Sequence, residues 1–177
     1  MGLSQYLAQE FLDYNPVTGL LIWKHRSRFF FKTYRSYKCW NAKYANKSAC
    51  NTLRPDGYLS GNVLGKTYLT HRIIWMWLYG YWPEEIDHKD GNKSNNCLKN
   101  LRDVSHAENQ KNRALPVNNK SGYIGIAWVS HASKWAAQIR INKKSKHLGY
   151  FDDLHEAISA RNTANNDFNF YPNHGRN

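Results

Sequence analysis

The stretch 86–113 constrains the fold of this chain more than any other part of the sequence. Residues 86–88 start like a short strand, and a polar loop rich in Asp, Asn and Gly, which favour tight turns, follows them. Leucines within 98–101 anchor a second short strand. Ser105 and Glu108 have the spacing of a capping box, which predicts a helix over 105–113. A strand, loop, strand and helix in so short a span favour a small α+β unit.

The residues before this stretch predict a β-rich region with two helices. A short helix is expected over 3–11, followed by a turn and an apolar strand over 20–23. A hairpin is expected from strands 58–63 and 67–70, and an apolar helix over 72–79 ends at a glycine. That helix is apolar on nearly all sides, so we expect it in the core.

The tail predicts a three-stranded antiparallel sheet with one helix. Residues 134–141 alternate apolar with polar or basic side chains, the period of a strand that is buried on one face. Strands are also expected over 121–129 and 145–150, and Asp153 begins a helix that runs to about residue 166. The polar link 115–120 separates this tail from the rest, which predicts two domains, 1–117 and 118–177.

The charge balance points to a polyanionic partner. The chain has 25 Lys and Arg against 13 Asp and Glu, a formal charge of +12 and a pI near 9.7. Residues 1–70 carry +7 (10 − 3), residues 71–117 carry +1 (7 − 6) and residues 118–177 carry +4 (8 − 4). Such a protein attracts nucleic acid or acidic membrane surfaces, and the more acidic centre is either a cation-dependent site or a solvated patch.

Composition excludes several classes of protein. The longest apolar run, 73–79, is far shorter than the roughly 20 residues that span a bilayer, and no leader segment is visible. The three cysteines are odd in number and form no C-x-x-C pair, which argues against a disulfide framework or a structural zinc site. A cytoplasmic protein with reduced thiols is expected, and no membrane partner.

The segment 24–38 interleaves six basic residues with five aromatic ones. This mixture suits phosphates and bases. An irregular loop whose aromatic rings pack inward would have the same composition, so both interpretations stay open here.

Four residues in 86–113 form an ordered set. Asp87 and His88 are adjacent, Asn100 lies twelve residues after His88, and Asn109 lies twenty-one after it. Together with the pair at 71–72, this order resembles the HNH endonuclease family, in particular the homing endonucleases of phages and group I introns. The resemblance covers about residues 13–113 and implies a ββα-metal nuclease core.

The resemblance also implies a role for each of the four residues. His88 would be the general base that takes a proton from water, because imidazole can do this near neutral pH. Asp87 and Asn109 would bind one divalent ion as hard oxygen ligands, which suit Mg²⁺ or Mn²⁺ rather than zinc. Asn100 would hold the loop together and orient the base.

Contacts with DNA are predicted in two places. In or next to the nuclease core, Arg72, His106 and Arg113 are candidates for binding phosphates, although a basic residue on a helix is common without such a role. The tail resembles the Apetala-two DNA-binding domain through its motifs at 121–126, 134–140 and 146–152. That family lays a three-stranded sheet in the major groove, and the residues expected to bind DNA here are Lys134, Gln138, Arg140 and Lys146.

The sequence therefore predicts an α+β, metal-dependent endonuclease acting on double-stranded DNA, of a nicking or homing type, in a phage-infected or bacterial cell. One active site cuts one strand, so a monomer should nick and a double-strand break would need a homodimer or two events. A DNA-binding regulator that keeps the nuclease fold without catalysis is the main alternative. An RNA-directed protein is a third, because bases of single strands stack on aromatic rings. No protein partner can be predicted.

Overall fold

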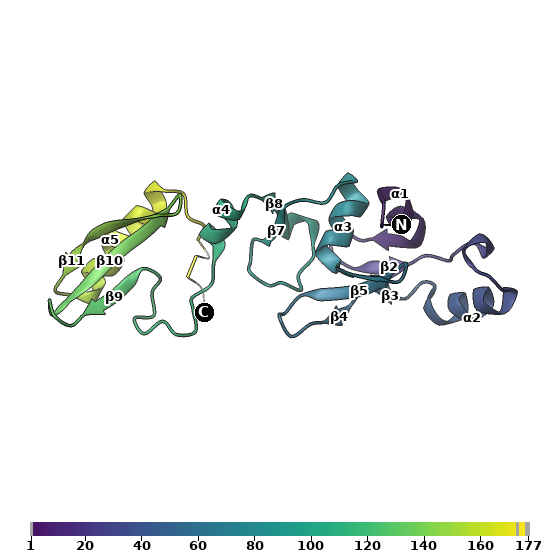
Figure 1. Ribbon diagram of the computed structural model, residues 1–177, viewed down its shortest axis with the longest axis horizontal. Coiled ribbons are helices and arrows are strands. Elements are labelled where there is room, and N and C mark those ends of the chain that lie inside the picture. Colours follow the sequence, from purple (N-terminus) through teal and green to yellow (C-terminus); the bar gives the residue numbers. More distant parts are fainter. Residues whose placement is uncertain (1, 173, 176–177) are drawn as a thin grey trace. The chain divides into compact units, whose positions relative to one another are not determined.

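The computed structural model describes residues 2–172 and 174–175 of the chain (Figure 1). It is an α+β protein of small antiparallel sheets and short helices, as the sequence predicts. The chain divides into two compact units, Met1–Val104 and Ser105–Asn177, and each is treated by itself. None of the described helices has the length and apolarity that crossing a membrane requires.

The N-terminal unit contains three small sheets, with strand orders β1-β2-β3, β4-β5-β6 and β7-β8. Its elements are α1 (Gln5–Phe11), β1 (Leu12–Tyr14), β2 (Leu21–Trp23), the 3₁₀ turn η1 (Arg28–Phe30), α2 (Tyr34–Tyr44), β3 (Ser48–Ala49), β4 (Thr52–Leu53), β5 (Leu59–Val63), β6 (Lys66–Leu69), α3 (Thr70–Tyr79), β7 (Glu85–His88), η2 (Leu98–Asn100) and β8 (Leu101–Val104).

Helices α1 and α3 pack together in the core of this unit. Phe11, Ile73 and Ile74 are fully buried there, so truncating any one to Ala should cost roughly 2–5 kcal/mol of folding free energy. Gly80 closes α3 with a φ of 76°, a left-handed conformation that glycine adopts without strain. The predicted core helix over 72–79 is therefore present, extended by two residues at its start.

Helix α2 is the main element that the sequence did not predict. Thr33 begins it with a capping box, its hydroxyl accepting from the Ser36 amide at 3.0 Å. On its inner side Asn41 is buried, and Tyr37 and Trp40 are half-buried. Part of the segment 24–38 is helical, because η1 and the first residues of α2 form within it. Part of it is also half-buried, so the segment is not exposed throughout.

The C-terminal unit has a three-stranded antiparallel sheet in the order β11-β10-β9, with α5 packed on it, as predicted. Its elements are α4 (His106–Asn109), the 3₁₀ turn η3 (Gln110–Asn112), β9 (Ile126–Val129), β10 (Lys134–Ile141), β11 (Lys144–Phe151) and α5 (Leu154–Asp167). The expected strand over 121–129 begins only at Ile126. The residues before it form a turn in which the Ser121 hydroxyl lies within hydrogen-bonding distance of two backbone carbonyls.

The division between the two compact units falls between Val104 and Ser105 in the chain, whereas the sequence predicted a domain boundary between residues 117 and 118. Hydrogen bonds to the end of the chain explain the difference. The Lys111 ammonium donates to the Phe168 carbonyl at 2.9 Å, and the Gly175 amide donates to the Arg113 carbonyl at 2.8 Å. These contacts tie the segment that follows α4 to the C-terminal unit.

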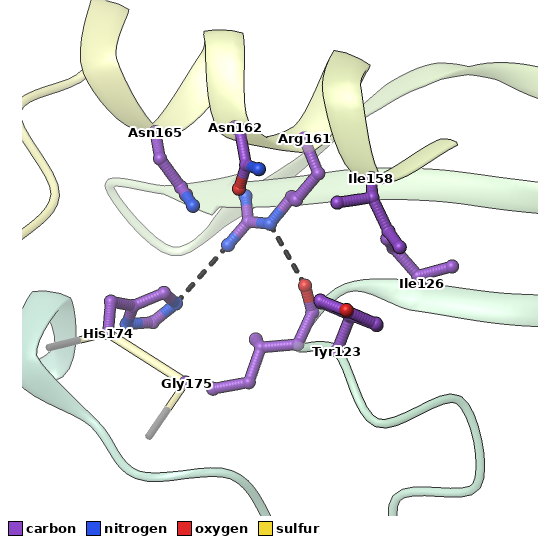
Figure 2. Close-up of a pocket in the computed structure, with 9 residues that line it drawn as sticks. Tyr123, Ile126, Ile158, Arg161, Asn162, Asn165, His174 and Gly175 are labelled. Carbon is purple, nitrogen blue, oxygen red and sulfur yellow. Dashed lines mark hydrogen bonds between the residues drawn. The ribbon is translucent and has the colours of Figure 1, made fainter. Parts of the chain in front are cut away.

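A buried arginine links α5 to the turn that precedes β9 (Figure 2). Arg161 is only 4% exposed; its Nε donates to the Ile124 carbonyl at 3.0 Å, and one terminal nitrogen lies 3.3 Å from His174 Nε2. Burial lowers the pKa of Arg161 to about 10. The guanidinium borders a cavity of about 50 Å³, which Asn162 and Asn165 also line.

Candidate active site

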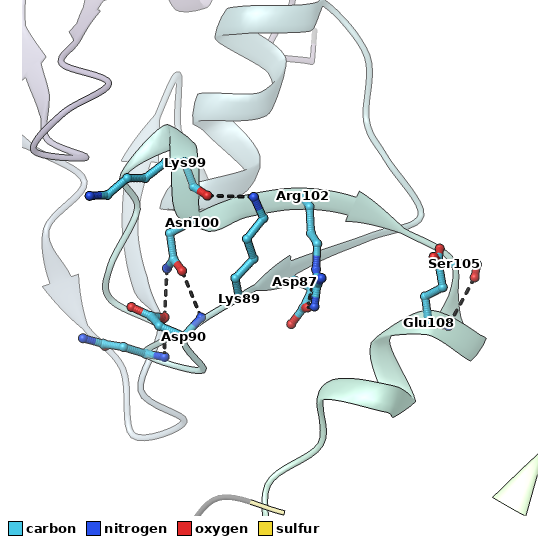
Figure 3. Close-up of polar contacts among 9 residues, drawn as sticks. Asp87, Lys89, Asp90, Lys99, Asn100, Arg102, Ser105 and Glu108 are labelled. Atoms are coloured by element: carbon cyan, nitrogen blue, oxygen red, sulfur yellow. Dashed lines mark hydrogen bonds and ion pairs between the residues drawn. The ribbon is translucent and has the colours of Figure 1, made fainter. Parts of the chain in front are cut away.

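Strand β7 carries Asp87 and His88, and η2, directly before β8, carries Asn100. Figure 3 shows Asp87 and Asn100. Strands β7 and β8 pair antiparallel, with Asp87 opposite Arg102 and His88 opposite Leu101. A polar loop joins the two strands and ends in η2 at Asn100. The hairpin therefore brings Asp87, His88 and Asn100 into one small region, as the sequence predicts.

Asp87 is nearly buried and forms an ion pair with Arg102 across the two strands. The Arg102 Nε lies 2.8 Å from the Asp87 Oδ2, and a second guanidinium nitrogen donates to the same oxygen. This double contact fixes the orientation of the carboxylate, since a guanidinium binds in a preferred plane. Arg102 was not among the predicted site residues.

His88 is 3% exposed and lies among polar and aromatic side chains. Its Nε2 is 3.1 Å from the Asn96 Oδ1, and its ring centroid is 5.1 Å from that of His71 and 5.9 Å from that of Tyr58. Burial lowers the pKa of His88 despite the hydrogen bond to Asn96 and the nearby carboxylates of Asp90 and Asp87, which raise it. The imidazole is thus kept neutral at physiological pH.

His71 is also buried and contacts the same region from the start of α3. Burial, with smaller contributions from His88 and Arg72, lowers the pKa of His71 to about 3. Its Nδ1 has no hydrogen-bond partner among the described residues. His71 is therefore a neutral group that forms part of the wall beside His88.

Asn100 binds the loop at three points (Figure 3). Its side-chain amide nitrogen donates to the Asp90 carboxylate at 2.9 Å and to the Asn95 carbonyl at 2.8 Å, while its oxygen accepts from the Asp90 amide at 3.0 Å. Burial raises the pKa of Asp90, but the hydrogen bonds from Asn95, Asn100 and the Asn92 amide outweigh burial and lower it overall. The loop is thereby closed around one ionised carboxylate.

The loop is also attached to the end of β1 and to the turn that joins β1 to β2. The Tyr14 hydroxyl donates to the Asn96 carbonyl at 2.9 Å, and the Leu98 amide donates to the Pro16 carbonyl at 2.9 Å. Gly19 has a φ of 74°, and a Cβ there would lie 2.5 Å from the backbone of Asn96. A glycine is required at this position because the loop backbone passes so close.

Arg72 has a structural contact that the sequence did not suggest. Its guanidinium donates to the Pro83 carbonyl at 2.9 Å and lies 5.8 Å from the centre of the Trp82 ring. These contacts connect α3 to the segment that enters β7. A contact between Arg72 and a phosphate stays a prediction.

The other predicted residues of the nuclease core lie in the C-terminal unit. Ser105 caps α4 by accepting from the Glu108 amide at 3.3 Å, and Asn109 is the last residue of α4. The predicted helix to Arg113 is wrong in its second half, because the chain tightens into η3 and is extended at Arg113. His106 and Arg113 are both exposed but do not share a helix face. The grouping of Asn109 with Asp87 in one metal site stays a prediction.

The sheet of the C-terminal unit has one face against α5 and one polar face. Ala137 and Ile139 are buried, while Gln138 and Arg140 are exposed, so the predicted alternation in β10 is present. On β11 the partners of Gln138 and Arg140 are His147 and Ser145. Since directly paired residues share a face, we call the set Ala136, Gln138, Arg140, Ser145, His147 and Tyr150 the polar sheet face.

Two predicted DNA contacts differ from the others on this sheet. Lys146 pairs with the buried Ile139, and its ammonium lies 5.4 Å from the centre of the Phe168 ring. It therefore belongs to the face opposite Arg140. Lys134 forms an ion pair with Asp152 at 3.0 Å, so part of its charge is already compensated.

The donor chemistry fits a hard divalent cation. Asp87 offers a carboxylate and Asn109 an amide oxygen, both of which Mg²⁺ and Mn²⁺ accept. Over residues 2–172 and 174–175, no group of three or more His, Cys, Asp or Glu side chains is placed to hold a metal ion.

Sequence reasoning gave no role in the site to Asp90, Asn96 or Arg102. A usable signal existed for two of them: Asp90 and Asn96 lie in a loop dense in Asp and Asn, where side chains commonly hydrogen-bond neighbouring backbone groups. Arg102 could be found only from the strand register, which places it opposite Asp87.

Comparisons with known proteins identify the family of this chain. Residues 68–111 match the HNH endonuclease family. Protein 3.8 of Escherichia phage T7 is 35% identical over 91 residues, covering 50% of this chain and 74% of that protein. The solved structure titled "DNA binding and cleavage by the HNH homing endonuclease I-HmuI" is 27% identical with a TM-score of 0.37, and the match covers 57% of this chain and half (50%) of that one. From the family match and the phage relative, this chain belongs to the HNH endonuclease family.

Proposed function

We propose that this HNH endonuclease hydrolyses phosphodiester bonds of duplex DNA with the help of one divalent metal ion. The observation that carries the proposal is the adjacent pair Asp87 and His88, buried on β7 and held by a hydrogen-bonded loop. A protein that only binds DNA has no need of a buried neutral imidazole beside an oriented carboxylate.

His88 would be the general base. An amide oxygen can only accept, so the contact between Asn96 Oδ1 and His88 Nε2 favours the tautomer with its proton on Nε2. The lone pair is then on Nδ1, which would take the proton from the attacking water. Burial keeps His88 uncharged, as a base must be before it reacts.

Asp87 and Asn109 would hold the metal ion, Mg²⁺ or alternatively Mn²⁺. A bound divalent cation supplies charge compensation at the phosphate and at the leaving oxygen. Arg102 orients the Asp87 carboxylate, and Asn100 would keep the loop beside His88 in place through Asp90 and Asn95. Because there is one such site per chain, a monomer should nick one strand.

Duplex DNA would contact the polar sheet face of the C-terminal unit. Gln138 and Arg140 are exposed side chains that can hydrogen-bond base edges in the major groove. His106, Arg113, Lys134 and Arg72 would contribute phosphate contacts, and the Apetala-two resemblance of this unit supports a sheet in the groove. The likeness to a phage protein is consistent with action inside an infected cell.

Nicking of supercoiled plasmid tests the proposal. The wild type is compared in Mg²⁺ and in EDTA with His88→Ala, and with His131→Ala, which removes an exposed histidine of the C-terminal unit. We expect nicking in Mg²⁺ only, a loss of about 10²–10⁴-fold in His88→Ala, and no loss in His131→Ala.

Binding to the same DNA is measured in parallel. Binding that persists in His88→Ala assigns the loss to chemistry. Tight binding by the wild type without cleavage in Mg²⁺ or Mn²⁺ would favour the regulator instead, and linear product from a proven monomer in one encounter would contradict a single nicking site.

A further inference from the structure

The segment between Tyr14 and Pro55 has a charge pattern that the active site does not use. It contains nine Lys and Arg residues and no Asp or Glu. Most of these cations lie on or beside η1 and α2, which the chain forms between β2 and β3. In Figure 1, α2 and the β7–β8 hairpin lie at opposite ends of the N-terminal unit.

The inner side of α2 is firmly attached to the core. Arg26 lies 3.9 Å from the centre of the Trp40 ring and 4.4 Å from that of Phe11. The Asn41 side chain exchanges two hydrogen bonds with the Arg26 backbone, at 2.9 and 3.1 Å. Because these contacts fix one side of the helix, the opposite side is presented in a defined orientation.

The outer side of α2 carries exposed cations. Arg35, Lys38 and Lys43 are all exposed, and none of them forms an ion pair with an acidic group in the described part of the chain. At a rise of about 1.5 Å per residue, Arg35 and Lys43 are separated by roughly 12 Å along the helix axis. That length corresponds to about three to four base pairs of duplex, at 3.4 Å per step.

Exposed aromatic rings accompany these cations. Phe29, in η1, is 87% exposed, and Tyr34, at the start of α2, is 62% exposed. The Lys38 ammonium lies 5.6 Å from the centre of the Tyr34 ring, so cation and ring are close on the same helix. A bulky apolar ring in solvent beside several cations is typical of surfaces that contact sugars or unstack bases.

We propose that the outer side of α2, together with the exposed rings of Phe29 and Tyr34 beside it, is a second DNA-binding surface that holds duplex DNA away from the scissile phosphate. We call it the α2 surface; it consists of Phe29, Tyr34, Arg35, Lys38 and Lys43. Charge complementarity selects the occupant, since the segment carries nine cations and no acidic residue, and duplex DNA carries about one negative charge per 1.7 Å of its axis. The proposal rests on the proposed function in one respect, which is that DNA is the substrate.

Salt-dependent binding of a duplex tests the α2 surface. Affinity for a labelled duplex is measured by fluorescence anisotropy in EDTA, so that cleavage plays no part. The variants are the triple Arg35→Gln/Lys38→Gln/Lys43→Gln and, as a control, Lys66→Gln, which removes an exposed cation from β6 of the same unit. Each lost phosphate contact lowers the slope of log affinity against log salt by about 0.9, so the triple variant should lose about 2–3 from the slope.

A separate variant tests the aromatic part at constant charge. Phe29→Ala should weaken duplex binding by about fivefold and leave the salt slope unchanged, because stacking or wedging does not release counterions. All the substituted side chains are exposed, so the thermal unfolding temperature should stay at the wild-type value.

The outcomes separate this proposal from the proposed function. A triple variant with the wild-type slope and affinity overturns the α2 surface, as does a loss of affinity for RNA or single-stranded DNA but not for duplex. A wild type that binds duplex and never nicks it overturns the proposed cleavage, while the slopes still decide on the α2 surface. A wild type that does not bind duplex overturns both.

Discussion

The loop between β7 and β8 and the polar sheet face of the C-terminal unit are both rich in polar residues, yet they are built in opposite ways. In the loop, Asn96 and Asn100 are almost fully buried and hydrogen-bonded. On the sheet, Gln138 and Arg140 extend into solvent. The polar groups of the loop lost their water during folding. Those of the sheet face lose theirs only when a partner binds.

This difference teaches which region is suited to chemistry and which to binding. A buried network holds its groups in one geometry before substrate arrives, which is what a general base needs. Exposed side chains on a rigid sheet retain rotamer freedom and can adapt to base edges. Substitutions of the buried, hydrogen-bonded residues of the loop should therefore affect stability and cleavage together, whereas those on the sheet should affect DNA affinity alone.

Asn100→Asp is the loop substitution for which we expect the largest effect. The new carboxylate replaces the amide that donates to Asp90 and to the Asn95 carbonyl, and it places a like charge against Asp90. We expect a loss of about 3 kcal/mol in the free energy of unfolding, because a buried contact is broken and a buried charge is unpaired. Nicking should fall by about 10–100-fold or more. Urea denaturation and plasmid nicking measure the two effects.

Asn92→Asp is the matched control in the same loop. The Asn92 side chain is exposed, and its oxygen only accepts hydrogen bonds, from the Ser94 amide and hydroxyl. A carboxylate can keep both contacts, so the change in stability should stay within about 0.5 kcal/mol. Equal losses in the two variants would mean that added negative charge, and not the hydrogen bonds of Asn100, determines the result.

The pH dependence of stability tests the burial of His71. Its pKa is lowered to about 3 in the folded protein, against an ordinary value of 6.5, so the unfolded chain binds the proton more tightly. Stability is complete above pH 6.5 and declines as pH falls toward 3. Between pH 7 and pH 5 the expected loss from this group is about 2 kcal/mol.

His71→Phe removes this titration and keeps a ring in the same place. The difference in urea midpoint between pH 7 and pH 5 should therefore become smaller in the variant. Part of the dependence should remain, because burial also lowers the pKa of His88. A pH dependence identical to that of the wild type would show that His71 is charged or accessible in the folded protein.

The same contrast between regions explains what the sequence could predict. The β7–loop–β8 order and the three-stranded sheet with its helix were predictable, because turn residues and apolar alternation are local signals. Helix α2 was not, since its inner residues Tyr37, Trp40 and Asn41 form no simple apolar stripe. Its contacts with Arg26 are what make it part of the core.

Within the site, the sequence predicted the residues that the family resemblance names. It did not predict the contacts that depend on the tertiary structure. Asp87, His88 and Asn100 lie in one hairpin, as expected. The pairing of Arg102 with Asp87 follows from the strand register, and the ring contact between His71 and His88 joins two distant segments. Neither has a local signal.

On the sheet, the face that Lys146 occupies could not be predicted for a related reason. The register shifts between Ala137 and Gln138, which pair with Gly149 and His147, so β11 carries an extra residue there. A bulge changes which face the following side chains occupy, and a strict alternation in the sequence does not reveal it. The pairing instead groups His147 with Gln138.

The smallest effect that we predict is a difference between two substitutions on this sheet. It separates hydrogen bonding to base edges from the long-range electrostatic attraction of DNA. Arg140→Gln and Lys146→Gln each remove one positive charge from neighbouring strands, so their contributions to long-range attraction are alike. Only Arg140 lies on the polar sheet face, so its loss should weaken binding of a preferred duplex by about 1–2 kcal/mol, against less than about 0.5 kcal/mol for Lys146. Anisotropy titrations at one salt concentration compare the two. Equal losses would mean that the sheet acts through its charge and that neither face reads the DNA, whereas a larger loss for Lys146 would place the duplex on the side of α5.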